Sequence, residues 1–255
     1  FKNCSNLTSV TIPDSVASIG NSAFQSCSNL TSVTIPDSVA SISDYAFYRC
    51  TSLTSINIPS SVTEIGIRAF SSCSSLTSIN IPDSVTSIGE YAFHRCDVFN
   101  TVNVSKLDIL FNDYSFAYEG NPFSKASTLH VNGEEVTELV IPNGVEELNG
   151  GFFYNFGKNV TSVTIPNSVT EIGENAFNDW TNLAQVTFGD SLKTIGTYAF
   201  NGCSALTRID LPNSLESIAG YAFYACSNLS YITLGDSLKT IAAWAFTGCN
   251  SFNTV

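Results

Sequence analysis

Two short motifs in the sequence could place a nucleophilic serine in a turn. The tetrapeptide Gly-Asp-Ser-Leu occurs at residues 189–192 and again at residues 235–238. Its serine could attack an ester only if a histidine accepted the hydroxyl proton. The chain has two histidines, His94 and His130, and both precede the motif, with no Asp-x-x-His stretch after it. We therefore reject an esterase role for Ser191 and predict no catalytic residues.

The cysteines share one position of a regular spacing: Cys4, Cys27, Cys50, Cys73, Cys96, Cys203, Cys226 and Cys249. A disulfide framework would have irregular spacing, and elsewhere this position holds Trp180, Gly157 or Gly133. We expect a buried ladder of thiols. Coils about 4.8 Å apart would still allow disulfides between neighbours by distance, so that alternative stays open. The Cys and His spacing does not suit zinc, and we expect no metal and no cofactor.

Acidic residues recur after the proline of Ile-Pro-Asp-Ser, at Asp14, Asp37 and Asp83. A stacked row of carboxylates could attract Ca²⁺, but calcium needs six or more converging oxygens. Later copies hold Asn143, Asn167 and Asn213 at this position. Asn, Asp and Ser all favour turns after a proline, so this position predicts a turn.

A 23-residue repeat positions all of these residues. The three segments that make up residues 7–75 align without gaps, and a fourth copy starts at Leu76. A second block starts at Val136 and continues after one inserted residue near Phe152. Each copy has eight apolar positions, which a single coil could not bury but stacked coils could. The sequence therefore predicts a repeat solenoid.

Each copy contains three expected elements. Residues 7–13 alternate apolar and polar side chains and predict a strand that Pro13 ends. Residues 15–19 predict a second short extended segment, and residues 20–24 predict a single helical turn. Gly189 takes the position of Pro13, so the Gly-Asp-Ser-Leu motif falls in the turn after a strand.

The pattern L-x-x-V-x-I-P-x-x-V-x-x-I-G-x-x-A-F-x-x-C resembles the BspA-like, or Treponema-type, leucine-rich repeat of bacterial cell-surface proteins. The resemblance covers nearly the whole chain. It implies a right-handed array of about ten 23-residue coils, with short parallel strands and a helical turn in each coil. It also implies a secreted or cell-surface protein, in a family associated with adhesion to host proteins or other cells. Hydrolases with the Gly-Asp-Ser-Leu motif are similar to this chain only in Phe-Gly-Asp-Ser-Leu.

One continuous solenoid is expected, with an N-terminal block at residues 1–98 and a C-terminal block at residues 136–255. An elongated, degenerate module at residues 99–135 joins them. Within it we expect a short helix, a turn and a returning strand, around Leu107–Phe111, Asn121–Pro122 and Leu129. The chain contains no Met, and we expect it to be a fragment of a longer protein.

Charge and hydropathy argue against two classes of partner. Ten Lys and Arg against 22 Asp and Glu give a net charge of −12, which repels nucleic acid and anionic lipid. No apolar run approaches the roughly 20 residues that would span a bilayer. We expect no nucleic acid, no membrane insertion and a monomer.

The candidate ligand-binding surface comes from departures from the repeat. Outward strand positions are small in the first block, as at Ser9 and Thr11, but become larger and charged in the second. Another position, two residues before the repeat Phe, becomes aromatic on three successive coils. Exposed aromatic side chains suit protein or sugar recognition, although they could instead only cover the outer flank of the solenoid. The candidate residues are Tyr198, Tyr221, Trp244, Tyr224, Arg208, Asp210 and Tyr231.

Two functions remain after these arguments. The first is a non-catalytic surface that binds a protein or glycan ligand, such as a host extracellular-matrix protein or a mucin. The second is a structural spacer that holds another domain of the full protein away from the cell wall. A spacer predicts that the array alone binds nothing.

Overall fold

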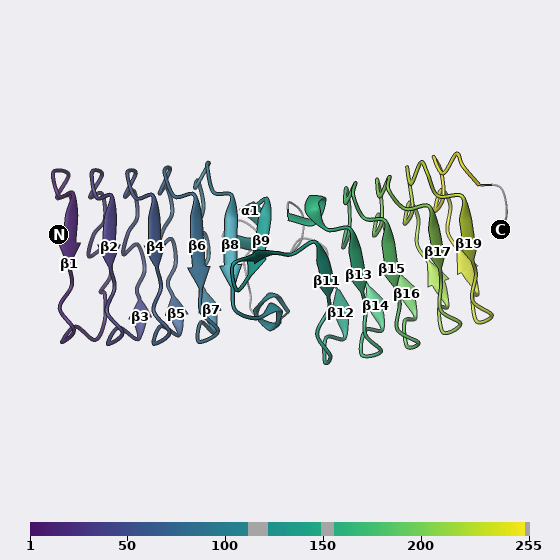
Figure 1. The fold of residues 1–255 in the computed structure, drawn as a ribbon, viewed down its shortest axis with the longest axis horizontal. Helices are drawn as coiled ribbons and strands as arrows, with labels where there is room; N and C mark the ends of the chain where they lie inside the picture. The colour runs from purple at the N-terminus through teal and green to yellow at the C-terminus, as the bar shows by residue number, and fades with distance from the viewer. Residues whose placement is uncertain (112–121, 149–155, 253–255) are drawn as a thin grey trace. The chain divides into compact units, whose positions relative to one another are not determined.

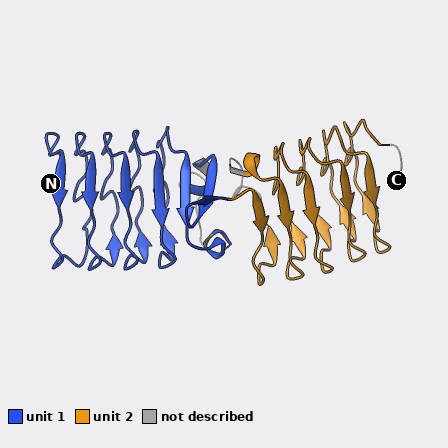
Figure 2. Ribbon diagram, in the orientation of Figure 1, with its two compact units in different colours: residues 1–135 blue, residues 136–255 orange. Residues whose placement is uncertain are grey.

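The computed structural model describes residues 1–111, 122–148 and 156–252. The chain forms two compact units, unit 1 at residues 1–135 and unit 2 at residues 136–255 (Figure 2). Each unit stacks short parallel strands at intervals of about 23 residues (Figure 1), which confirms the predicted solenoid.

The long ladder of unit 1 consists of parallel strands whose side chains alternate between core and solvent. Val33 of the second strand is buried between exposed Ser32 and Thr34, and it pairs in register with Val10. The strands are β1 (Ser9–Thr11), β2 (Ser32–Thr34), β4 (Ser55–Asn57), β6 (Ser78–Ile81), β8 (Thr101–Val104) and β9 (Thr128–Val131). A second ladder contains β3 (Ser41–Ile42), β5 (Glu64–Ile65) and β7 (Ser87–Ile88).

The elongated segment adds one longer coil to unit 1. Thr101 of β8 pairs with Thr128 of β9, an offset of 27 residues. The expected helix is the 3₁₀ helix η1 (Leu107–Leu110), and the expected strand near Leu129 is β9. Asn121 lies outside the described residues, and Pro122 begins the short helix α1 (Pro122–Lys125).

A hairpin follows this longer coil. Strand β9 turns back into the antiparallel strand β10 (Glu134–Glu135). Asn132 and Gly133 occupy the turn with positive φ angles of 52° and 86°. The assignment of Gly133 to the cysteine position is therefore wrong, because the hairpin interrupts the repeat there.

Unit 2 repeats the same two ladders. Glu138 pairs with Ser162, a spacing of 24 residues that confirms one extra residue in this coil, although Phe152 itself lies outside the described residues. The long strands are β11 (Glu138–Val140), β13 (Ser162–Thr164), β15 (Gln185–Thr187), β17 (Arg208–Asp210) and β19 (Tyr231–Thr233). The short strands are β12 (Glu147–Leu148), β14 (Glu171–Ile172), β16 (Thr194–Ile195), β18 (Ser217–Ile218) and β20 (Thr240–Ile241), and η2 (Phe156–Asn159) is a 3₁₀ helix.

The predicted helical turn at residues 20–24 is wrong. Ser22 and Ser26 have positive φ angles of 59° and 60°. These two residues are in the left-handed region, so the backbone does not continue as a right-handed helix. The N–H groups of Ala23 and Gln25 bond within their own coil, whereas that of Phe24 donates to Ala46 O of the next coil. The N–H groups of Ser22 and Ser26 also donate to the next coil, to Asp44 O and Tyr48 O. Three of these five donors thus join neighbouring coils, while an α-helix would use them internally.

Stacked phenylalanine rings run through the core of both units. In unit 1, Phe47 and Phe70 stack with ring centroids 5.4 Å apart, and in unit 2, Phe200 and Phe223 stack at 5.1 Å. All four side chains are fully buried. The repeat Phe therefore forms the same core in both units.

Most of the cysteines form the predicted buried ladder. The Cys50 thiol donates to Phe24 O at 3.1 Å, and the same contact recurs from coil to coil. Burial raises the pKa of Cys50 to about 12. Cys4 is exposed and Cys249 is partly exposed, so the prediction of burial is wrong for these two. The remaining six, Cys27, Cys50, Cys73, Cys96, Cys203 and Cys226, are buried.

Candidate ligand-binding surface

Four outward side chains from β17 and β19 form what we call the strand-face cluster: Arg208, Asp210, Tyr231 and Thr233. The side chains between them in sequence, Ile209 and Ile232, point into the core and are 1% and 3% exposed. Because successive residues of a strand face opposite sides, this burial forces the four polar or aromatic side chains outward. Arg208 pairs with Tyr231, and Asp210 pairs with Thr233.

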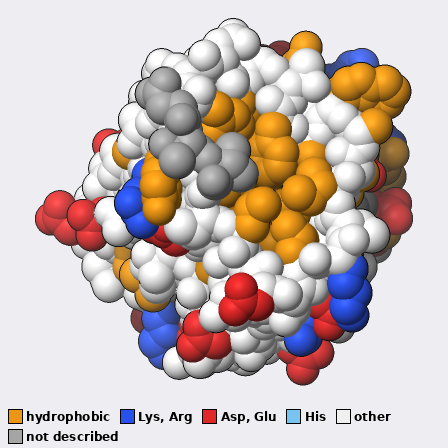
Figure 3. Space-filling model, turned by 90° about the vertical axis from the view of Figure 1, so that its right-hand side faces the viewer, with side chains coloured by type: hydrophobic (Ala, Val, Ile, Leu, Met, Phe, Trp, Pro, Cys, Tyr) orange, Lys and Arg blue, Asp and Glu red, His pale blue; other side chains and the backbone are white. Residues whose placement is uncertain are grey.

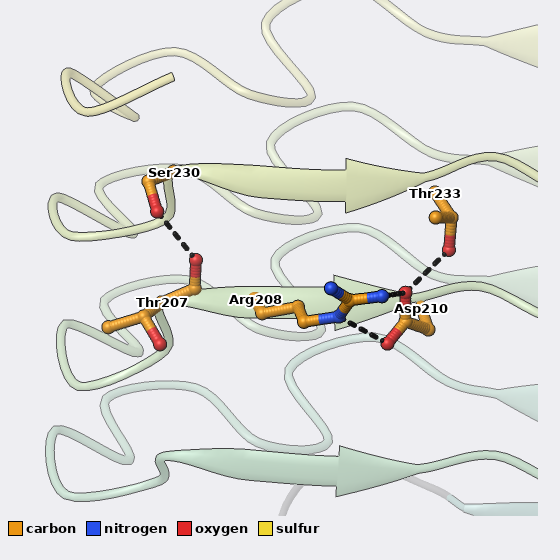
Figure 4. Close-up of polar contacts among 5 residues, drawn as sticks. All are labelled: Thr207, Arg208, Asp210, Ser230 and Thr233. Atoms are coloured by element: carbon orange, nitrogen blue, oxygen red, sulfur yellow. Dashed lines mark hydrogen bonds and ion pairs between the residues drawn. The ribbon is translucent and has the colours of Figure 1, made fainter. Parts of the chain in front are cut away.

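The strand-face cluster is held together by its own contacts, and Figure 4 shows those among Arg208, Asp210 and Thr233. Arg208 donates from Nε and Nη2 to the two carboxylate oxygens of Asp210, at 2.7 and 2.8 Å. Thr233 Oγ1 donates to Asp210 Oδ1 at 2.8 Å. The guanidinium carbon of Arg208 lies 4.2 Å from the ring centroid of Tyr231, within the range of a cation–π contact. The four side chains therefore contact one another across the two strands.

The ion pair also shifts the protonation of both partners. The hydrogen bonds from Arg208, followed by that from Thr233, hold the pKa of Asp210 below its ordinary value. The hydrogen bonds that Arg208 donates to Asp210 raise the pKa of Arg208. Both side chains are more than half exposed, at 57% and 53%, so water screens this interaction.

A depression of about 490 Å³ lies beside the strand-face cluster. It is lined by Arg208 and Asp210 and by five residues of the neighbouring coil: Ala184, Gln185, Val186, Thr187 and Phe188. Among the described residues, β15 and β17 belong to different hydrogen-bonded sheets. Phe188 occupies a core position that holds Ile165 and Leu211 in adjacent coils, and its ring packs edge-on against Phe200 at 6.1 Å. We attribute the opening to this larger ring.

Tyr198, Tyr221 and Trp244 stack on one another along the turns of unit 2 and form, with Tyr224, what we call the aromatic ladder. The ring centroids are 4.9 Å apart for Tyr198 and Tyr221 and 5.3 Å apart for Tyr221 and Trp244. Tyr224 meets Tyr221 edge-on at 5.6 Å. The faces of the Tyr221 ring are therefore covered by its neighbours, and the ladder presents mainly ring edges.

Trp244 and Tyr224 are the most exposed members of this ladder, at 61% and 39%. Figure 3 views the structure from the side of the last described coil and shows apolar side chains gathered there. Leu234 and Ile241 are also exposed in this coil. Leu234 and Ile241 stand at positions that are core positions in other coils. Trp244 is thus one of several side chains that are exposed in this last described coil.

The candidate residues form two separate groups. Arg208, Asp210 and Tyr231 come together on the strands, whereas the aromatic ladder lies on the turns. Among these described residues, no hydrogen bond, ion pair or ring contact links one group to the other. The sequence also distinguishes Gln185 and Thr233, which are outward strand positions that change in the second block, although the candidate residues do not include them. Sequence reasoning missed Phe188. The signal was present, since Phe188 is aromatic where other copies hold Ile, Leu or Val.

Unit 1 carries aromatic residues at the position of the aromatic ladder as well. Tyr45 contacts Tyr48 edge-on at 5.6 Å, and the Arg68 guanidinium carbon lies 4.9 Å from the Tyr91 ring centroid. Aromatic contacts at this position therefore occur in both units, although the stacked rings and the strand-face cluster are described in unit 2.

The Gly-Asp-Ser-Leu motif lies in the turn between β15 and β16. The Asp190 N–H donates to Asn167 Oδ1 of the preceding coil at 2.8 Å, and the hydroxyl of Ser214, at the position of Ser191 one coil later, donates to Leu192 O at 2.7 Å. These contacts stack one turn on another. His94 and His130 both belong to unit 1, where His94 packs against Tyr91 and His130 Nδ1 lies 3.1 Å from Gly133 O.

Two absences hold for the described residues. No three side chains of His, Cys, Asp or Glu gather there as a metal ion would require. No helix in that part of the chain is long and apolar enough to cross a membrane.

Comparison with known proteins decides the family. The family described as "BspA type leucine rich repeat region" matches residues 1–121 and 129–253 in six copies. The chain belongs to the BspA-type leucine-rich repeat family. This membership accounts for the 23-residue spacing and the stacked core of both BspA-type units.

Solved structures of bacterial leucine-rich repeat proteins are similar to this BspA-type chain. A leucine-rich repeat protein from Bacteroides ovatus is 28% identical over 98% of this chain and 79% of its own, with a TM-score of 0.55. A leucine-rich cell surface protein from Faecalibacterium prausnitzii is 24% identical over 97% and 86%, with a TM-score of 0.46. The pneumococcal vaccine antigen PcpA is 18% identical over 96% and 76%, with a TM-score of 0.48. No match was found among curated proteins.

Proposed function

We propose that this BspA-type protein is a non-catalytic binding module, secreted or displayed on a cell surface, that presents the outer face of unit 2 to a protein or glycan ligand. The observation that carries the proposal is the strand-face cluster beside its depression. The resemblance of the repeat to those of bacterial surface proteins supports the location.

The strand-face cluster supports binding over a purely structural spacer. A spacer needs an apolar core and a polar surface, and unit 1 already has both, with buried apolar side chains inside and small Ser, Thr and Asn side chains on the outward strand positions. Arg208, Asp210 and Tyr231 instead fix one another through an ion pair and a ring contact. Side chains that are already ordered lose less conformational entropy when a ligand binds.

Charge narrows the class of ligand. A net charge of −12 disfavours nucleic acid, anionic lipid and other strongly acidic partners. Arg208 is the one cation of the depression lining, and Asp210 compensates it. The module therefore suits a neutral or mildly basic protein surface, such as an extracellular-matrix protein, or a glycan. We propose that it acts as a monomer.

The Gly-Asp-Ser-Leu turns fit the non-catalytic proposal. Their backbone groups join neighbouring coils, as when Leu192 O accepts a hydrogen bond from the Ser214 hydroxyl of the next coil. A chromogenic short-chain ester assay tests this directly: we expect no turnover above that of the Ser191→Ala variant. Turnover that depends on Ser191 would contradict the proposal.

A binding screen tests the proposed function. The wild-type protein is immobilised and exposed to extracellular-matrix proteins, mucins and a glycan array, and we expect at least one ligand. A reversal variant gives unit 2 the residues of unit 1, with Arg208→Ser, Asp210→Thr and Tyr231→Ser, and should lose that ligand. The triple variant Tyr198→Ala, Tyr221→Ala and Trp244→Ala tests the aromatic ladder in parallel. Absence of any ligand for the wild type would favour the spacer.

A further inference from the structure

We infer that the depression beside the strand-face cluster binds an uncharged sugar residue of a glycan. The inference rests on the proposed function and specifies its site and ligand class.

The size and lining of the depression suit a sugar ring. Its volume of about 490 Å³ falls within the roughly 300–1,000 Å³ typical of small-ligand sites. Four of the seven lining residues are polar, namely Gln185, Thr187, Arg208 and Asp210, and three are apolar. A pyranose ring likewise has hydroxyl groups at its edge and C–H groups on its faces, so a mixed lining can contact both.

The polar lining offers donors and acceptors side by side. Arg208 donates two of its N–H groups to Asp210, and a guanidinium carries five in all, so three others remain. Asp210 accepts three hydrogen bonds, and a carboxylate has about four acceptor sites. The exposed amide of Gln185 can both donate and accept. Adjacent sugar hydroxyls need this combination, because each of them donates one hydrogen bond and accepts others.

Charge excludes an acidic sugar. The Arg208 charge is compensated at hydrogen-bond distance by Asp210, and the chain as a whole carries −12. A sialic acid or sulfated sugar would approach the Asp210 carboxylate without an uncompensated cation in the lining to offset the repulsion. An uncharged sugar meets no such cost.

The position of the depression disfavours a peptide. An added peptide strand needs an exposed sheet edge, and a bound helix needs an apolar groove. The unpaired edges of β15 and β17 have Cα atoms within 8 Å of each other, which leaves no room for a strand between them. Four of the seven lining residues are polar, so the depression is not an apolar groove either. The aromatic ladder is a poorer sugar site, because Tyr221 is covered on both faces by Tyr198 and Trp244.

A titration with small sugars tests the inference on the whole chain. The probes are the uncharged sugars lactose, mannobiose and diacetylchitobiose, with 3′-sialyllactose as the acidic counterpart of lactose, and binding is followed by saturation-transfer NMR and calorimetry. The variants are Asp210→Asn and Gln185→Ala. Ser55→Ala is the matched control, because Ser55 holds the strand position of Gln185 in unit 1 and is exposed. Far-UV circular dichroism checks that each variant is folded.

We expect at least one uncharged sugar to bind. Each of the two variants should weaken it about fivefold or more, since one hydrogen bond contributes about 1 kcal/mol. Ser55→Ala should leave the affinity unchanged, and sialyllactose should bind more weakly than lactose. Gln185→Ala keeps the ion pair intact and therefore stays informative if Asp210→Asn is unstable.

Four outcomes would overturn the inference. If a sugar binds equally well to both variants, the site is wrong. If sialyllactose binds better than lactose, the charge argument is wrong. If a protein ligand from the screen binds and no uncharged sugar does, the ligand class is wrong while the proposed function stands. If neither sugars nor proteins bind, the proposed function fails as well.

Discussion

From β1 to β8 the long ladder of unit 1 carries Ser, Thr or Asn at its outward positions, whereas the same positions of β17 and β19 in unit 2 carry Arg208, Asp210 and Tyr231. Even so, the two units share a strand register and a ring stack in the core. In unit 1 the outward Asn80 and Asn103 join through a 3.0 Å amide hydrogen bond, a contact of like residues from one coil to the next. The comparison shows that inward positions maintain the scaffold while outward positions can change without altering it.

Truncation of the repeat Phe should have the largest effect and should be alike in both units. Phe70→Ala and Phe200→Ala each remove a fully buried ring, and we expect each to lower the free energy of unfolding by about 3–5 kcal/mol. Urea unfolding by circular dichroism reports both units. Tryptophan fluorescence reports unit 2 alone, because both tryptophans, Trp180 and Trp244, lie there. A large loss for one variant and none for the other would break the equivalence of the two cores.

The next largest change in stability is expected where the core of unit 2 differs from that of unit 1. Trp180 stands at a cysteine position, and a Cβ added to Gly157 would lie 1.8 Å from its Cε2 atom. We expect Gly157→Ala to cost about 3 kcal/mol through overpacking. The double variant Gly157→Cys, Trp180→Cys copies the cysteine ladder of unit 1 and should recover much of this loss in thermal unfolding. A stable Gly157→Ala protein would contradict the close packing.

A smaller effect on stability is expected at the residue just before the repeat cysteine, where the backbone has a left-handed conformation. Ala225 has φ 57°, between Gly202 and Gly248 in the adjacent coils, and unit 1 holds Ser26, Arg49, Ser72 and Arg95 there with similar angles. We expect Ala225→Gly to raise the free energy of unfolding by about 0.5 kcal/mol, because relief of the left-handed cost exceeds the added entropy of the unfolded chain.

The reverse substitution provides the control for Ala225→Gly. A Cβ at Gly248 would lie 3.0 Å from the Ala225 Cα atom, so Gly248→Ala should be destabilising. Thermal unfolding measures both changes, and opposite signs are expected. Destabilisation by Ala225→Gly would show that strain at this position is negligible.

The smallest effect is the pH dependence of the strand-face cluster. The folded-state pKa of Asp210 is lowered, so its contribution to stability is complete above the unfolded value of about 3.9 and is lost as the pH falls through the folded pKa. Wild type should therefore lose more thermal stability below pH 4 than Asp210→Asn does. The difference should shrink in high salt, since the pair is exposed and screened. Equal acid sensitivity of the two proteins would indicate that the ion pair adds no stability.

Much of the scaffold was predictable from local patterns. Alternation around Val10 predicted the strand, and the repeated Phe predicted the core, because burial requires apolar side chains at fixed positions. The helical turn at residues 20–24 was not correctly predicted, because Ser22 and Ser26 give no glycine-like signal of a positive φ. Hydrogen bonds to the next coil stabilise that backbone, and a single copy of the repeat does not contain them.

The sequence by itself determined the length of the coil, its inward side chains and the residues that depart from the repeat, since spacing and polarity are properties of the chain. Only the tertiary structure decided which of those residues meet. Arg208 and Tyr231 are 23 residues apart and come together because stacking places them in register on neighbouring strands. The depression likewise brings Gln185 and Phe188 of one coil together with Arg208 and Asp210 of the next, a neighbourhood that no single strand specifies.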